Sequence, residues 1–298
     1  MLNFAPVTID SKDIIHAYLN QNVYRNCDFS FSNIYCWKHL YDTEYCIEKD
    51  CLFFHFHTAS NRAGYMMPLG ATDDLKPAIH QLMEDARERN NEFFLFAITA
   101  DMFKKIEASH PGMFQYQQSR DWAEYLYLSQ DLISLKGKKF QSKRNHINKF
   151  KKTYRYEYLP ITRDIIPDCI KLYDRWRHED KQLENKESLD KERIAMQTAF
   201  DNFERLQLKG GALRIDGEIL AYSYGQALND DTFCVHAEKS LSSIDGGFSM
   251  INQQFAEHEG AAYTYINREE DLGLESLRQA KLSYQPAIIM PKGFISIK

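Results

Sequence analysis

The sequence predicts a mixed α/β fold, of the α+β kind, in which central sheets are flanked by helices. Short strand-like runs of apolar residues alternate with helical patterns along the whole chain. Asp216 and Gly217 lie between two such runs and predict a hairpin turn, which makes those two strands antiparallel. The apolar run at 92–99 leads into a helical pattern, as expected where a helix crosses between strands. No dinucleotide or Walker motif is present, so a doubly wound nucleotide fold is not favoured.

The first half of the chain contains helical and strand patterns in a clear succession. The strongest helix prediction is 74–90, where Ile79 and Leu82 belong to an apolar stripe at helical spacing. Pro111 and Gly112 break the chain before the last strand pattern of this half. The predicted elements are helices at 10–20, 28–41, 74–90 and 100–109, a hairpin at 44–58 that turns at 48–50, and strand segments at 64–70, 92–99 and 114–128.

The second half begins with a basic helical segment and contains the strongest strand signals of the chain. Residues 210–240 predict three successive strands, with turns at 216–217 and at 229–231. The other predicted elements are helices at 136–155, from 167 onward, at 189–207, after the Gly-Gly pair at 246–247 and at 274–283, and strands at 154–161, 261–266 and 286–298. In the helix after the Gly-Gly pair, the predicted apolar stripe is Phe248, Ile251 and Phe255.

The two halves share a loose order of helices, hairpin, strand, helix, strand, helix and strand. A length of 298 residues suits two domains of ordinary size. We therefore expect an N-terminal domain at 1–130 and a C-terminal domain at 131–298, with the boundary near 129–136. We expect the second domain to carry the functional site and the first to support it.

The composition is that of a globular protein, with 44% hydrophobic and 27% charged residues. No apolar run approaches the roughly 18 residues that a membrane-spanning helix needs, and no signal peptide is evident at the N-terminus. The six cysteines form neither a CxxC pair nor a regular framework, so we expect reduced and mostly buried thiols. These features favour a cytoplasmic protein.

Residues 136–155, called here the basic segment, contain nine lysines and arginines and no acidic residue. The whole chain carries −5, so the remaining 278 residues carry −14. This density of cations favours the binding of phosphates of RNA, of a nucleotide or of lipid headgroups. The alternative is a solvated helix whose cations pair with the acidic remainder of the chain. Lys143 and Arg144 form its most polar point with Asn145, whereas Phe140, Ile147 and Phe150 are predicted to be core.

Gly246 and Gly247 precede a helix that follows a strand, where free backbone N–H groups favour an anion. The alternative is an ordinary turn in which Asp245 caps the helix. Glu238 ends the preceding strand and is a candidate general base. A surface glutamate paired with Lys239 or with the basic segment is an equally simple interpretation.

The segment Asn267-Arg268-Glu269-Glu270-Asp271 places five polar residues after an apolar strand-like run. Asp271 can cap the following helix, but the other residues are not needed for a cap. We consider two uses for them: an ionic clamp onto the basic segment, or a site that holds an amine acceptor. His55 and His57 alternate on a strand, yet no third ligand is suggested by spacing, so no metal site is predicted.

Two motifs, "LKGKKFQSKRNHINKF" and "YINREEDLGLESLRQAKLSYQP", resemble the family named for the C-terminal domain of phosphatidylglycerol lysyltransferase. The order of elements in the second half is similar to that of the GNAT N-acyltransferase fold. The resemblance extends over nearly the whole chain and implies two tandem GNAT-like domains, the first of them degenerate.

The resemblance implies an acyl- or aminoacyltransferase whose donor is aminoacyl-tRNA or acyl-CoA and whose acceptor is an amine or hydroxyl. The acceptor would attack the donor carbonyl directly, without a covalent enzyme intermediate. The donor is then a substrate, so no tightly bound cofactor is expected. Possible partners are tRNA and, through peripheral contact, anionic lipid.

The chain departs from the GNAT pattern at two positions. Residues 243–248 lack the leading Gln or Arg of a coenzyme A loop, and Asp245 would repel a pyrophosphate. Residues 279–284 lack a tyrosine at the first position, where a GNAT enzyme often has its general acid. The first departure weighs against acetyl-CoA as the donor, and the second removes the usual general acid.

The predicted site combines these candidates in the second half of the chain. The predicted donor-binding residues are Lys143, Arg144, Gly246 and Gly247; the predicted acceptor-binding residues are Asn267 and Arg268; and the predicted catalytic residues are Glu238, Glu269 and Asp271. The alternative function is a non-catalytic module in which the GNAT site is degenerate and the basic segment docks RNA or an anionic membrane surface.

Overall fold

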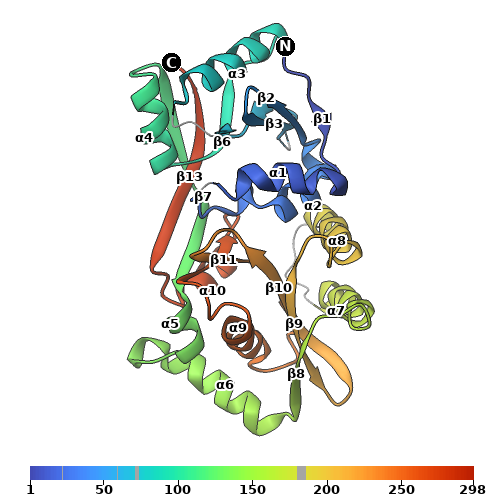
Figure 1. Cartoon of the computed structure of the whole chain (residues 1–298). Helices are drawn as coiled ribbons and strands as arrows, with labels where there is room; N and C mark the ends of the chain where they lie inside the picture. The colour runs from blue at the N-terminus through green and yellow to red at the C-terminus, as the bar shows by residue number, and fades with distance from the viewer. Residues whose placement is uncertain (22, 59, 71–73, 180–185) are drawn as a thin grey trace. The chain divides into compact units, whose positions relative to one another are not determined.

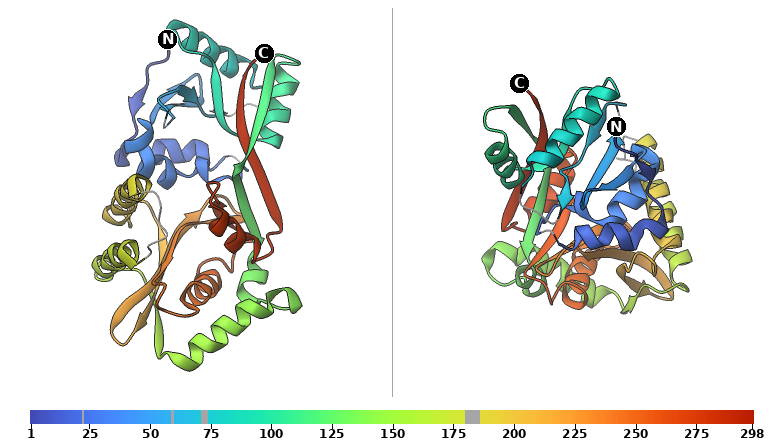
Figure 2. Two further views of the ribbon diagram at one scale, coloured as in Figure 1. Left: turned by 180° about the vertical axis from the view of Figure 1, so that it is seen from behind. Right: turned by 45° about the horizontal axis from the view of Figure 1, so that its top comes forward.

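The computed structural model describes residues 1–21, 23–58, 60–70, 74–179 and 186–298 (Figure 1). The chain forms two compact units, each with mixed strands and helices. Unit 1 comprises Met1–Glu124, Glu270–Leu274 and Ile289–Lys298, and unit 2 comprises Tyr125–Glu269 and Glu275–Ile288. Both chain termini therefore belong to unit 1 (Figure 2). The mixed α/β fold class is confirmed, whereas the domain limits at residue 130 stay a prediction.

Unit 1 consists of strands of very different length and four α-helices among its described residues. Its strands are β1 (Ala5–Pro6), β2 (Glu44–Glu48), β3 (Cys51–His57), β4 (Ala63–Tyr65), β5 (Leu69–Gly70), β6 (Phe94–Thr99), most of β7 (Phe114–Leu128) and most of β13 (Ile288–Ile297). Its helices are α1 (Lys12–Leu19), α2 (Phe31–Tyr41), α3 (Lys76–Glu88) and α4 (Ala100–Ser109).

The sheet of unit 1 has the order β1-β2-β3-β4-β6-β13. β2 and β3 form an antiparallel hairpin, in agreement with the predicted turn, and β3 also pairs antiparallel with β4. β4 and β6 are parallel at Tyr65 and Leu95, because α3 crosses between them. The last strand of the chain, β13, pairs antiparallel with β6.

Unit 2 contains the basic segment and the predicted site. Its strands are β8 (Tyr156–Pro160), β9 (Lys209–Ile215), β10 (Glu218–Ala227), β11 (Thr232–Ser240) and β12 (Tyr265–Glu270), of which the last residue belongs to unit 1. Its helices are α5 (Ser129–Ser134), α6 (Gln141–Thr153), α7 (Ile166–Glu179), α8 (Lys186–Asp201), α9 (Gly247–His258) and α10 (Glu275–Leu282).

The sheet of unit 2 has the order β12-β11-β10-β9-β8. β8, β9, β10 and β11 pair antiparallel in succession, and both predicted hairpin turns are confirmed. α9 then crosses to β12, which is parallel to β11. Unit 1 has the same succession of an antiparallel hairpin, a helix crossover to a parallel strand and a further helix, which supports the predicted internal duplication.

The aromatic residues fill the cores of both units, as the composition predicts. Phe140, Ile147 and Phe150 of the basic segment are buried, which confirms that they belong to the core. α9 differs from the prediction, because Met250, Ile251 and Phe255 are buried whereas Phe248 is 43% exposed. Ile251 and Phe255 of the predicted stripe are thus confirmed, and Met250 takes the place predicted for Phe248. Five of the six cysteines are buried, as predicted.

Two elements depart from the sequence prediction. Residues 129–134, expected as the domain boundary, form the short helix α5. The strand expected at 261–266 lies at Tyr265–Glu270, so the polar residues from Asn267 to Glu270 are part of the strand rather than its end. Residues 261–264 instead form a turn after α9, in which the N–H of Tyr263 donates to the carbonyl of Gly260.

Candidate active site at the fork of β11 and β12

β11 and β12 pair over only part of their length. Their parallel ladder begins at Thr232 and ends where Cys234 lies opposite Asn267, although β11 continues to Ser240. On its other edge, β11 has a bulge: Ala237 pairs with Tyr224 and Val235 with the next residue of β10, so His236 is the extra residue. The strand pair therefore opens into a fork beyond Cys234, and polar side chains line both of its arms.

The central ion pair of this fork joins Glu238 on β11 to Arg268 on β12. Nη2 of Arg268 donates to Oε1 of Glu238 over 2.9 Å, and both side chains are nearly buried, at 13% and 10% exposure. The other carboxylate oxygen of Glu238 accepts from the amide of Asn252 in α9, also over 2.9 Å. Two predicted site residues, separated by thirty positions in the chain, are thus in direct contact.

The ring of Tyr284, just after α10, lies next to two cationic side chains of the fork. The ammonium of Lys143 lies 4.0 Å from the centre of its ring, and the guanidinium of Arg268 lies 4.9 Å from it. The hydroxyl of Tyr284 donates to the hydroxyl of Ser249, in the first turn of α9, over 3.4 Å. We call Lys143, Glu238, Asn252, Arg268 and Tyr284 the Arg268 cluster.

The electrostatics of the cluster differ among its members. Burial, reinforced by the charge of Arg268, lowers the pKa of Lys143 to about 8. Burial also acts against the charge of Arg268, but the carboxylate of Glu238 leaves the pKa of Arg268 raised. Burial raises the pKa of Tyr284 to about 12, so its hydroxyl keeps its proton at neutral pH. Near neutral pH the cluster is therefore cationic overall.

Two polar atoms of the cluster have no hydrogen-bond partner among the described residues. Nη1 of Arg268 is a buried donor, and Oδ1 of Asn252, whose residue is 3% exposed, is a buried acceptor. An unmatched buried polar group is costly, and such groups are rare in proteins unless water or a ligand satisfies them. Both atoms belong to side chains that hold Glu238, so this position can accept a polar ligand.

The Gly-Gly pair begins α9, as predicted, and the neighbouring backbone leaves too little room for a side chain at Gly246. Gly246 has a left-handed backbone, with φ of 79°, and a Cβ there would lie 2.6 Å from the carbonyl oxygen of His146 in α6. Asp245, expected to repel phosphate, forms an ion pair with Lys149 of α6. The packing of α6 against the start of α9 therefore brings part of the basic segment to the predicted anion-binding turn.

Arg144 and Asn267 have local hydrogen bonds that compete with their predicted roles. Arg144 donates to the carbonyls of Leu135 and Gly137 and to the side chain of Gln141, so it holds the turn before α6. Oδ1 of Asn267 accepts the N–H of Glu269 over 2.8 Å. Asn267 is fully buried, and this bond holds the left-handed backbone of Glu269, whose φ is 57°.

The acidic residues of the predicted motif have different partners. Glu269 lies 2.8 Å from Nδ1 of His236, in unit 2. Glu270 pairs with Lys292 in unit 1. Asp271 is also part of unit 1, where its carboxylate accepts from Arg120 over 3.1 Å and from the N–H of Gly273 over 2.9 Å. Neither the contact of Glu269 nor that of Glu270 involves the basic segment, so the clamp of these acids onto it stays a prediction.

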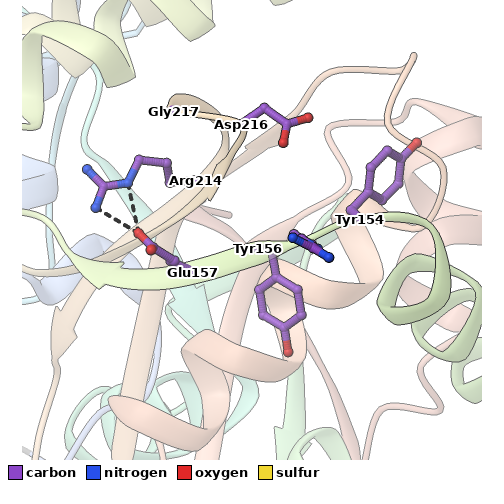
Figure 3. A pocket seen from close by; sticks show the side chains of 7 residues that line it. Tyr154, Tyr156, Glu157, Arg214, Asp216 and Gly217 are labelled. Carbon is purple, nitrogen blue, oxygen red and sulfur yellow. Dashed lines mark hydrogen bonds and ion pairs between the residues drawn. The ribbon is translucent and has the colours of Figure 1, made fainter.

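Two surface hollows of unit 2 lie away from these residues. One is lined by Tyr154, Tyr156 and the ion pair of Glu157 with Arg214, next to the hairpin turn at Gly217 (Figure 3). The other lies between the end of β8 and the segment that follows α8. None of the predicted site residues lines either hollow. Arg155 of the basic segment lines the first one.

Sequence reasoning missed several members of the site. Tyr284 was considered only as the last residue of a motif that lacked its usual tyrosine, and Asn252 was not singled out. Tyr127, whose hydroxyl donates to the carbonyl of Lys281, lies 5.7 Å from Arg268 and also escaped notice. The available signal was a tyrosine at position 284, just after a predicted helix, where a buried hydroxyl needs a partner.

In the described parts of the chain, no helix is both long enough and apolar enough to cross a bilayer.

Among known sequences, an uncharacterised protein of Mycoplasmoides gallisepticum is 25% identical over 177 residues, which are 58% of this chain and 56% of that protein. The chain thus matches little more than half the length of this relative.

Solved structures match over the full length. A conserved protein of unknown function from Bacteroides thetaiotaomicron is 44% identical, with a TM-score of 0.94 and complete coverage of both chains. The C-terminal domain of a protein described as a lysylphosphatidylglycerol synthetase, from Agrobacterium fabrum, is 12% identical, with a TM-score of 0.67 over 97% of this chain and 91% of that one.

A tandem GNAT protein from the clavulanic acid biosynthesis pathway has a TM-score of 0.51 at 8% identity, over 100% of this chain and 98% of that one. The expected tandem GNAT-like fold is therefore confirmed. Residues 21–292 match the family described as phosphatidylglycerol lysyltransferase, C-terminal, which confirms the resemblance of the two motifs. The chain belongs to this family.

Proposed function

We propose that the chain is an aminoacyltransferase whose reaction takes place at the Arg268 cluster of unit 2. The family carries the name of a lysyltransferase. The observation that supports the location best is the fork, where Glu238, Arg268 and Lys143 gather around Tyr284 beside the start of α9. The unmatched atoms of Arg268 and Asn252 support a polar ligand at that position.

In the proposed reaction, the acceptor amine or hydroxyl attacks the ester carbonyl of the donor directly. The acceptor proton passes to Glu238, whose oxygens retain lone pairs beyond those used by Arg268 and Asn252. Arg268 faces the negative charge that develops on the carbonyl oxygen. The carbon–oxygen bond of the donor ester then breaks, and the leaving oxygen takes the proton of Tyr284. Proton exchange with solvent returns a proton to Tyr284 and removes the one on Glu238.

Aminoacyl-tRNA is the donor that the surface supports better than acyl-CoA. Lys136, Lys138, Lys151 and Lys152 of the basic segment are exposed, as a surface that follows a phosphate backbone requires. The turn at 243–248 lacks the coenzyme A pattern, and its acidic residue is already paired with Lys149. Glu269 and Asn267 are kept as candidates near the acceptor, and Asp271 as a candidate further along the motif.

Turnover of the purified full chain tests this proposal. Transfer of labelled amino acid from charged tRNA, with lysyl-tRNA first, should appear in vesicles containing phosphatidylglycerol or in a pool of small amines, and labelled acyl-CoA should give less. Glu238→Gln should lower the rate by roughly 10²- to 10⁴-fold, as expected for loss of a general base. Glu257→Gln, an exposed glutamate on α9, is the matched control and should leave the rate unchanged.

The runner-up is a non-catalytic module that docks RNA or an anionic membrane through the basic segment. Its exposed lysines favour it as much as they favour a tRNA donor. The two functions separate on turnover: tight, salt-sensitive RNA binding without transfer from any charged tRNA or acyl-CoA would establish the module and refute the transferase. Unchanged RNA binding after Lys151→Glu and Lys152→Glu would refute the basic segment both as a binding surface for a tRNA donor and as a docking surface for RNA.

A further inference from the structure

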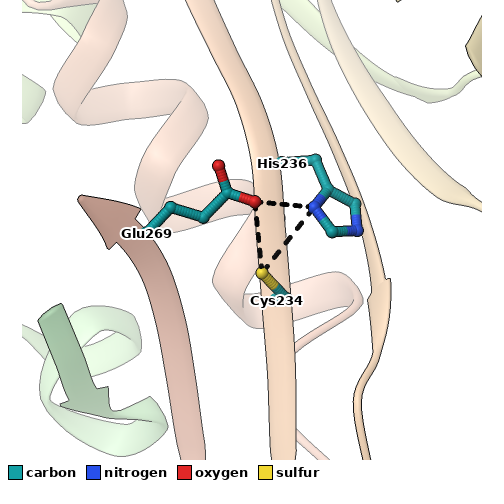
Figure 4. A group of neighbouring side chains, drawn as sticks. All are labelled: Cys234, His236 and Glu269. Atoms are coloured by element: carbon teal, nitrogen blue, oxygen red, sulfur yellow. Dashed lines mark hydrogen bonds and ion pairs between the residues drawn. The ribbon is translucent and has the colours of Figure 1, made fainter. Parts of the chain in front are cut away.

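A second group of side chains lies at the same fork and shares no residue with the Arg268 cluster. Cys234 and His236 project from β11, and Glu269 comes from β12 (Figure 4). Sγ of Cys234 lies 3.7 Å from Nδ1 of His236 and 3.6 Å from a carboxylate oxygen of Glu269, and that oxygen lies 2.8 Å from Nδ1. We call these three residues the Cys-His-Glu group.

From this geometry we propose that the Cys-His-Glu group binds a zinc ion with one open coordination position. Thiolate, imidazole and carboxylate are the three protein ligands that zinc prefers, at about 2.3, 2.0 and 2.1 Å. Around a tetrahedral ion these bond lengths separate the ligand atoms by about 3.4 to 3.6 Å. The two distances from Cys234 already fall close to this range.

Only the contact between His236 and Glu269 must lengthen, by roughly 0.6 Å, to admit the ion. That contact is a hydrogen bond in the metal-free chain, so the Nδ1 proton of His236 must move to Nε2 when the ion binds. The thiol of Cys234 loses its proton to solvent. Zinc, one thiolate and one carboxylate then form a neutral site, which suits side chains that are mostly buried.

The backbone holds two of the ligands in position. His236 is the extra residue of the β11 bulge, which places its side chain beside that of Cys234 two residues earlier. Glu269 has a left-handed backbone that few residues other than glycine adopt, and the side chain of Asn267 accepts its N–H. Asn267 thus acts as a positioning residue for Glu269.

The chain contains a comparable cysteine-containing group in unit 1, and the comparison is informative. Cys27, Asp28, Glu124 and Glu270 also converge, but the ammonium of Lys292 lies within 2.5 to 2.6 Å of the carboxylates of Asp28 and Glu124 and also contacts Glu270. A lysine therefore supplies the cation there. The Cys-His-Glu group instead combines a thiol, an imidazole and a carboxylate beside the strand fork. These three ligand types together suit a metal ion.

Three protein ligands leave a fourth position for water or a substrate oxygen, as in catalytic rather than structural zinc sites. This proposal goes beyond the proposed transfer reaction and departs from the sequence-based expectation that no metal binds. It does not depend on the transferase, because metal binding is measured without donor or acceptor.

Titration of the metal-free full chain with Co²⁺ tests the site, because cobalt reports both thiolate ligation and coordination number. We expect one ion per chain, a thiolate charge-transfer band in the near ultraviolet, and visible bands of a four-coordinate ion that zinc abolishes. Azide should change the visible bands if the fourth position is open. Absence of a thiolate band in the parent protein would overturn the proposal, whatever the variants do.

Variants assign the band to its residues. Cys234→Ser should abolish the thiolate band, and Glu269→Gln should weaken zinc binding by about tenfold or more while keeping the thiolate band. Cys27→Ser is the matched control, since Cys27 is also buried beside carboxylates, and its band should equal that of the parent. A band that survives Cys234→Ser, or that Cys27→Ser removes, would contradict the assignment.

Discussion

Two lysines, the buried Lys292 in unit 1 and the half-buried Lys143 in unit 2, have opposite surroundings. The ammonium of Lys292 contacts the carboxylates of Asp28, Glu124 and Glu270, which outweigh burial and raise its pKa well above the ordinary value. The ammonium of Lys143 instead lies over the ring of Tyr284, with Arg268 nearby, and its pKa falls to about 8.

The difference fits a structural role for the ion pairs of Lys292 and the proposed ligand-binding role of the Arg268 cluster. Lys292 is surrounded by more negative charge than it carries, so its own chain supplies every counter-charge it needs. Lys143 shares a cationic cluster in which Glu238 is the only carboxylate described here. Excess positive charge in a partly buried cluster favours an anionic ligand, and a strongly perturbed lysine pKa is typical of functional sites.

Replacement of Lys292 by methionine should have the largest effect on stability. It leaves the carboxylates of Asp28, Glu124 and Glu270 close together without a cation, and breaking a buried ion pair costs about 3–5 kcal/mol. Urea unfolding of Lys292→Met should therefore show that loss in the free energy of unfolding. Lys292→Arg keeps the charge and should lose less; equal losses in the two variants would mean that packing, not charge, makes Lys292 important.

Gly246→Ala should have the next largest effect, because Gly246 lets α6 pack against the start of α9. The new methyl group meets the carbonyl oxygen of His146, and alanine must adopt the left-handed backbone. Together these costs amount to about 2–3 kcal/mol in thermal or urea unfolding. Gly217→Ala is the control, since its φ is 88° but open space surrounds it, and it should cost only about 1 kcal/mol.

If the two glycine variants lose equal stability, the packing of α6 on α9 is not what requires Gly246. The same variants bear on the comparison of the lysines, because α6 carries Lys143. A Gly246→Ala protein that folds but binds RNA or donor more weakly would connect this packing to the ligand site.

The elements of the fold could be predicted well from local patterns, and the site only in part. The turn at Asp216-Gly217 and the stripe of Ile79 and Leu82 are local signals, so the hairpin and the helix around them were correctly predicted. β12 was misplaced because its polar residues violate the expected strand pattern. Their partners, Glu238 for Arg268 and Lys292 for Glu270, are 30 and 22 positions away in the chain.

The same limit explains which members of the Arg268 cluster could be singled out from the sequence. Lys143, Glu238 and Arg268 carry charges that stand out in the sequence, and the structure brings them together. Tyr284 and Asn252 are ordinary residues of a helix end and a helix interior, and only their contacts distinguish them. The lack of a partner for Nη1 of Arg268 among the described residues cannot be seen in a sequence, because it depends on where all neighbouring side chains lie.

Lys143→Met should have the smallest net effect, because relief from burying a charge opposes the lost contact with the ring of Tyr284. Its pH dependence is the informative part. The pKa of Lys143 is about 8 in the folded chain and near its ordinary 10.5 when unfolded, so burial of its charge costs stability below pH 8. This cost disappears as the pH rises from 8 to 10.5, where the folded lysine is already neutral. Methionine carries no charge and avoids the cost throughout.

The free energy of unfolding of Lys143→Met, relative to the parent chain, should therefore be most favourable below pH 8 and decline towards pH 10.5. Chemical unfolding at several pH values measures it, and Lys151→Met, an exposed lysine of the same helix, should leave the profile of the parent unchanged. A relative stability that rises with pH would mean that Lys143 is stabilised by a counter-charge as Lys292 is, and the contrast between the two lysines would fail.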